Sequence, residues 1–151
     1  MNKRIIQVAW VAGVGFLAAG CGTPSGGGPN PAIIIPAPGE PVSLATHVQP
    51  IFTAHCASCH RDGGGASVLV GINIRLDNAS NSFDTLVNQP SAQNANFTLV
   101  KESDSANSLL YLKISGNNPP VGNRMPFLSS PLPDDEIRVI KDWIDQGALN
   151  N

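Results

Sequence analysis

The stretch Cys56-Ala57-Ser58-Cys59-His60 places two thiols and an imidazole at the spacing C-x-x-C-H. On a helical turn the two cysteines are neighbours, so both sulfurs lie along one side of the turn. This spacing is typical of covalent attachment of a c-type haem, with the histidine as an iron ligand. We therefore predict that Cys56 and Cys59 attach a haem c and that His60 is its proximal iron ligand.

Two other kinds of site use a C-x-x-C pair. A structural zinc site closes on four ligands, usually from two such pairs, and a redox-active dithiol of the thioredoxin kind belongs to a βαβ context. The chain has three cysteines and therefore no second pair. Haem attachment is the favoured interpretation, and zinc binding and dithiol chemistry are the alternatives.

Residues 1–20 have the features of an export signal. Lys3 and Arg4 precede an apolar run over residues 5–19, which is short for a membrane span. Residues 17–21, Leu-Ala-Ala-Gly-Cys, resemble a bacterial lipobox, which implies cleavage before Cys21 and acylation of its thiol. The alternative is an ordinary signal peptide whose removal leaves Cys21 as a free thiol. The lipobox explains the odd cysteine, so no disulfide is predicted.

The following segment is predicted to be a tether. Half of residues 22–43 are Pro or Gly, and Glu40 is the only charged one, which is typical of a linker. Ile33-Ile34-Ile35 could dock on the domain or on a membrane, but we favour an apolar patch within a linker. The predicted organisation is a signal peptide at 1–20, a lipidated cysteine with its tether at 21–43, and one domain at 44–151.

The net charge limits the choice of partners. Removal of the signal peptide leaves seven basic residues against eleven acidic ones, a net charge of −4. An acidic protein is a poor candidate for binding nucleic acid or anionic lipid surfaces. A partner with a basic docking surface would suit it better.

The first helix of the domain is predicted to carry the cysteine motif. Thr46 and Gln49 have the spacing of a capping box, and Pro50 fits only within a first turn, so the helix should begin near Thr46. Apolar residues then recur at helical spacing as far as Cys56.

Two further helices follow from apolar periodicity and terminators. The first covers residues 105–115 before Gly116, and the second begins at Pro133, with acidic residues in its first turn and Gly147 after its end. Trp143 should pack in the core. Between these helices and the motif the pattern is weak: residues 68–76 favour an extended piece and residues 82–87 a helical turn.

Met125 is the best candidate for the second axial ligand of a haem iron. After signal removal it is the only methionine, and it lies in a proline-rich loop over residues 118–126. A thioether is a soft ligand that raises the reduction potential of a haem. His47 and His55 precede the motif on the same helix, so we expect both to be solvated. Arg124, beside Met125, is a candidate for pairing with a haem propionate.

Three more stretches support a family resemblance. They are Val48-Gln49-Pro50-Ile51-Phe52, residues 108–114, and Glu136-Ile137 with residues 143–148. With the motif and Met125-Pro126, they resemble class I c-type cytochromes, and more narrowly the modules called planctomycete-type cytochrome c. The resemblance covers residues 44–148 and implies an all-α, class I cytochrome c fold around one covalently attached haem.

The chain departs from this family at one position. Many members have a proline after the motif whose carbonyl accepts the N–H of the proximal histidine. Here Gly63-Gly64-Gly65 occupies that region, so the sequence does not indicate which carbonyl orients His60.

The resemblance implies an electron carrier rather than an enzyme. A single C-x-x-C-H argues against two-haem peroxidases, and Met125 fills the iron position that an enzyme keeps open. A peroxidase-like haem enzyme and a haem-based sensor with a displaceable Met125 are the alternatives. The expected partners are a redox donor and a redox acceptor protein, with no nucleic acid. The expected location is that of an exported bacterial lipoprotein, held on a membrane through Cys21 and facing the periplasm or the cell surface.

Overall fold

The computed structural model describes residues 31–151, so the predictions for Cys21, the signal peptide and residues 22–30 lie outside the described residues. Five α-helices follow one another along the chain: α1 (Gln49–His55), α2 (Gly65–Val70), α3 (Ala79–Leu86), α4 (Leu109–Ser115) and α5 (Asp134–Asp145). A π-helical turn, η1 (Leu44–Val48), leads into α1, and a 3-10 turn, η2 (Ser105–Asn107), precedes α4. Over residues 31–151 the chain forms isolated β-bridges but no strand, which confirms the all-α class.

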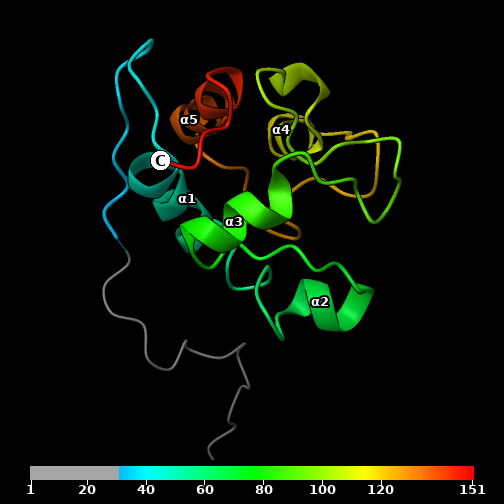
Figure 1. Cartoon of the computed structure of the whole chain (residues 1–151). Coiled ribbons are helices and arrows are strands. Elements are labelled where there is room, and N and C mark those ends of the chain that lie inside the picture. Colours follow the sequence, from blue (N-terminus) through cyan, green and yellow to red (C-terminus); the bar gives the residue numbers. More distant parts are fainter. Residues whose placement is uncertain (1–30) are drawn as a thin grey trace, which may run out of the picture.

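The helices are arranged around one core (Figure 1). α5 packs against η1, η2 and α4, while α2 lies at one end of the molecule, away from α5. The core is apolar, and its largest fully buried side chains are Trp143, Phe52, Leu44, Ile51, Leu86, Leu109, Ile140 and Ile144. None of the helices within residues 31–151 is long and apolar enough to cross a bilayer.

The helical segment that carries the motif begins earlier than predicted. Ser43 is the cap, since its Oγ accepts a hydrogen bond from the Thr46 amide at 3.2 Å. The predicted capping box of Thr46 and Gln49 is therefore wrong. The Gln49 side chain is buried and accepts from Ser82 Oγ at 2.7 Å while donating to the Leu76 carbonyl at 3.0 Å. A buried amide needs such partners, so Gln49 joins α1 to α3 instead of capping a helix end.

Helix α5 follows the sequence prediction, whereas the helix predicted at 105–115 is divided: η2 covers Ser105–Asn107, Ser108 is extended, and α4 begins at Leu109. Gly116 ends α4, and Pro133 immediately precedes α5, whose first turn is acidic. Trp143 is fully buried, and its Nε1 donates to the Leu149 carbonyl at 3.0 Å, which confirms its place in the core.

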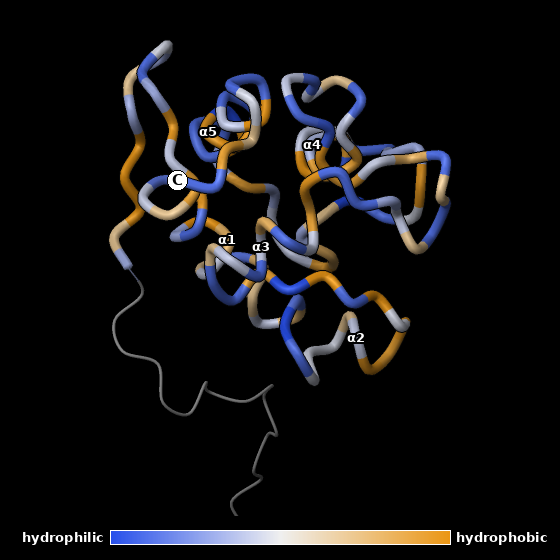
Figure 2. Tube along the Cα trace, viewed as in Figure 1, coloured by the Kyte–Doolittle hydropathy of each residue, from blue (hydrophilic) through white to orange (hydrophobic). Residues whose placement is uncertain are grey.

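The chain between the motif and α4 differs from the prediction in one element. The helical turn predicted at 82–87 is confirmed as part of α3, but Val68, Leu69 and Val70 are helical instead of extended. The reason is the glycine on each side: Gly64, which is extended, immediately precedes α2, and Gly71 ends it in the left-handed conformation at a φ of 67°. These three apolar side chains are 69%, 81% and 67% exposed. Figure 2 shows this apolar end of α2 at the edge of the molecule.

Residues 33–43, which we call the strap, lie against the domain and correct part of the tether prediction. Val42 is buried, and Ile33 packs against the core. Gln146 accepts a hydrogen bond from the Val42 amide at 2.8 Å and donates to the Glu40 carbonyl at 3.0 Å. Arg138 donates to the Pro36 carbonyl at 2.7 Å. Figure 1 shows the strap beside the helical domain, near α5. Because the strap forms no helix of its own, its peptide groups can pair with the side chains of Arg138 in α5 and Gln146 at the end of α5.

Candidate functional site

The cysteine motif forms a closed turn at the end of α1. The Cys56 amide donates to the Phe52 carbonyl at 2.9 Å, which continues the helix. The Cys56 carbonyl then accepts the amides of Cys59 at 3.1 Å and His60 at 2.9 Å. Cys56 packs against the core, Cys59 is exposed, and both are free cysteines. The turn therefore presents one sheltered and one open thiol.

Burial shapes the acidity of Cys56. Burial first, then the negative charges of Glu136 and Cys59, raise the pKa of the Cys56 thiol to about 12. A raised pKa is typical of a thiol in apolar surroundings. Over residues 31–151, no group of three or more His, Cys, Asp or Glu side chains is arranged to hold a metal ion, so the zinc alternative lacks a ligand set there.

His60 has a buried ring nitrogen without a partner. Its Nδ1 makes no hydrogen bond within the described residues, although a buried nitrogen without a partner is costly. Burial, and then the charge of Lys113, lower the pKa of His60, which favours the neutral imidazole that binds metals. Among residues 31–151 no carbonyl accepts a hydrogen bond from this nitrogen, so the structure supplies no partner that would orient the His60 ring.

The three glycines after the motif fold the chain back onto it. The Gly64 amide donates to the Arg61 carbonyl at 2.9 Å, and the Ala66 amide donates to the Cys59 carbonyl at 3.1 Å. A Cβ on Gly64 would overlap the carbonyl oxygen of Cys59 and lie 2.9 Å from its carbonyl carbon. The close backbone approach at this position therefore requires glycine.

Lys113 of α4 holds the loop that carries Met125. Its carbonyl accepts the Met125 amide at 2.8 Å, and its Nζ donates to the carbonyls of Val121 at 2.6 Å and Asn123 at 3.3 Å. Met125 is half-buried and packs against the core. The charge of Lys113 also contributes to the lowered pKa of His60, so this lysine influences both predicted axial ligands. Its role was missed because nothing local in the sequence pairs it with either one.

The remaining predicted residues occupy well-defined positions. Arg124 donates to the Ser129 carbonyl at 2.7 Å, so its guanidinium is engaged within its own loop, and its propionate contact stays a prediction. The expectation that His47 and His55 are solvated is wrong. His47 Nδ1 accepts the Ser43 amide at 2.9 Å, and His55 Nε2 lies 3.0 Å from Glu136 Oε2. His47 thus accepts a hydrogen bond from the residue that caps η1, and both imidazoles are half-buried.

These donors fit a covalently bound haem. The thiols of Cys56 and Cys59 lie at the two ends of one turn, and the imidazole of His60 follows directly. The His60 ring has one nitrogen without a partner among the described residues, and Lys113 holds the loop that carries the Met125 thioether. Cys56 and Cys59 are the residues that would form thioether bonds, and His60 and Met125 those that would ligate iron.

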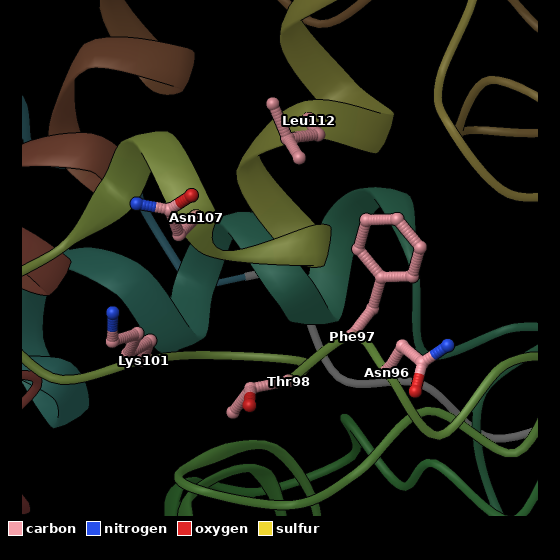
Figure 3. Close-up of a pocket in the computed structure, with 6 residues that line it drawn as sticks. All are labelled: Asn96, Phe97, Thr98, Lys101, Asn107 and Leu112. Carbon is pink, nitrogen blue, oxygen red and sulfur yellow. The ribbon is translucent and has the colours of Figure 1, made fainter.

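The described part of the chain also contains a cavity with other lining residues (Figure 3). It has a volume of about 390 Å³ and is bounded by the 96–101 segment, η2 and α4. Its lining residues are Asn96, Phe97, Thr98, Lys101, Asn107 and Leu112. The ammonium of Lys101 is paired with Asp104 at 2.7 Å, so this cavity offers no free cationic group. None of the predicted site residues lines it.

Comparison with known proteins gives little further information. No known family matches the chain, and no curated protein is similar to it. Among solved structures it is similar to Kuenenia stuttgartiensis hydrazine synthase, with 24% identity and a TM-score of 0.45. The similar region covers 71% of this chain and 16% of that one, so the chain spans about a sixth of that protein's length. A likeness this distant carries no functional assignment.

Proposed function

We propose that this protein is a class I, mono-haem c-type cytochrome, related to the planctomycete-type modules, that carries single electrons between redox partner proteins. The observation that carries the proposal is the closed C-x-x-C-H turn at the end of α1, which brings Cys56, Cys59 and His60 together on one turn. A lipid on Cys21 would hold the exported protein at a membrane surface.

Each residue of the site has one role in this proposal. The bound haem supplies the one-electron couple of its iron. Cys56 and Cys59, which attach the group, need only react once, and the raised pKa of Cys56 keeps its thiol protonated at neutral pH until then. His60 and Met125 are the residues that would ligate the iron, and a thioether ligand such as Met125 would favour a higher reduction potential. Lys113 positions Met125 through three main-chain contacts.

The support for a carrier over a haem enzyme lies in the Met125 loop. An enzyme or a ligand sensor needs an iron position that a substrate or gas can enter, and an enzyme also needs an acid or base beside it. The Lys113 contacts hold the Met125 loop at residues 121, 123 and 125, which favours a filled position.

Two measurements on the purified, exported protein test the proposal. We expect the haem to stay with the protein during acidified-acetone extraction, and to be absent after Cys56→Ala with Cys59→Ala, while the control Ser58→Ala retains it. Loss of the haem from the wild-type protein to the solvent contradicts covalent attachment. We also expect the spectrum of the reduced protein to be unchanged by carbon monoxide. A spectral change on adding carbon monoxide favours the enzyme or sensor alternative.

A further inference from the structure

A buried carboxylate lies beside the haem-attachment turn. The side chain of Glu136, in the first turn of α5, is 11% exposed, whereas that of its neighbour Asp135 is 77% exposed. Its Oε2 lies 3.0 Å from Nε2 of His55, the last residue of α1 and the neighbour of Cys56. The contact lacks hydrogen-bond alignment, and neither atom has a hydrogen-bond partner among the described residues.

Because Glu136 is buried beside the cysteine turn, little solvent screens its charge from the groups on that turn. Its influence is already apparent at Cys56, where it is the largest contribution to the thiol's raised pKa after burial. A charge removed from solvent is weakly screened, so it acts on other groups at the same turn as well. The first turn of a twelve-residue helix stabilises a carboxylate at this position, and the His55 imidazole lies against it.

We propose that Glu136 is a potential-setting residue: its carboxylate, held beside Cys56 by His55, stabilises the oxidised state of the bound haem and lowers its reduction potential. This inference rests on the proposed function, because it requires a haem on Cys56. Oxidation leaves one more positive charge on the iron, and a nearby negative charge favours that state. In the sequence Glu136 is one of three acidic residues at the start of a helix. In the fold it is the one of the three that is buried.

The test is a potentiometric titration of the haem-loaded, full-length protein at pH 7 and low ionic strength, followed by haem absorbance. Glu136→Gln keeps the side-chain shape and removes the charge. We expect the equilibrium constant for reduction to rise about tenfold, which is about 59 mV for one electron. Glu136→Asp keeps the charge and should stay close to the wild-type potential. Asp135→Asn removes an exposed charge from the same turn and should also leave the potential nearly unchanged.

A second variant covers the case in which Glu136→Gln does not fold. His55→Lys places a permanent positive charge beside the carboxylate, at a side chain that is 34% exposed, and should also raise the potential. An unchanged potential in either folded variant overturns the inference, and so does an equal rise in Asp135→Asn. These failures occur with haem bound. Failure of the proposed function is different, because the wild-type protein then has no covalent haem to titrate.

Discussion

The adjacent glycines Gly64 and Gly65 should respond in opposite ways to the same substitution. A Cβ on Gly64 would overlap the Cys59 carbonyl oxygen and lie 3.0 Å from the Arg61 carbonyl oxygen. Both obstacles are backbone atoms of the motif turn, so relief requires that the chain itself moves. The nearest atom to a Cβ on Gly65 is the flexible Leu69 Cδ1, at 4.0 Å, which is ordinary contact.

The expected magnitude follows from these contacts. Forcing a carbon atom into occupied space typically costs about 1–3 kcal/mol, so Gly64→Ala should lower the free energy of unfolding by that amount. For a domain of this size the Tm should fall by roughly 4 °C or more. Gly65 begins α2, where alanine is the better helix former, so Gly65→Ala should be neutral or stabilise by up to about 1 kcal/mol.

The assay is thermal and urea unfolding of the haem-loaded protein, followed by circular dichroism. Wild-type, Gly64→Ala and Gly65→Ala proteins are compared at equal haem content. A Gly64→Ala protein as stable as the wild type would show that the close approach to Cys59 does not exist. A Gly65→Ala protein that loses as much stability would show that the loop tolerates no side chain at all, and that the contact at Gly64 is not the cause.

Three other substitutions test separate parts of the molecule. Gln146→Ala removes the two hydrogen bonds that Gln146 makes to the strap and should lower the free energy of unfolding in urea by about 1–2 kcal/mol, whereas the exposed control Asn150→Ala should not; stability equal to the wild type would mean that the strap does not depend on Gln146. Met125→Ala should lower the reduction potential and let carbon monoxide bind, and persistence of the near-infrared sulfur-to-iron band would refute the ligand assignment. Cys21→Ser should release the protein from membranes or leave its signal uncleaved, and mass spectrometry of a wild-type N-terminus without lipidated Cys21 would contradict the lipoprotein prediction.

Local signals in the sequence predicted the elements that local physics determines. Gly116 and the acidic turn after Pro133 mark helix boundaries wherever they lie in a fold, and α4 ends and α5 begins where expected. Residues 68–70 were mispredicted because β-branched side chains favour extended chain, but the glycines on either side impose a helical turn that the core does not touch.

Long-range partners could not be predicted. The strap depends on Arg138 and Gln146, which lie 102–106 residues further along the chain, and a Pro/Gly-rich composition gives no sign of them. The same holds at the candidate site. The motif and Met125 are recognisable from residue type and spacing, whereas Lys113 and Glu136 look like ordinary surface charges until the fold places them beside the site.

The strap also limits how far the domain could range from a membrane. A tether from Cys21 to Leu44 would reach at most roughly 80 Å, but if Ile33 is the first docked residue, the reach from Cys21 falls to roughly 40 Å. The volume open to an anchored domain scales with the cube of this reach, so it shrinks roughly sevenfold to eightfold. The effective concentration of the domain toward a partner in the same membrane rises by a similar factor. A lipid on Cys21 would then favour contact with partner proteins close to the bilayer and disfavour contact with partners that extend far from it.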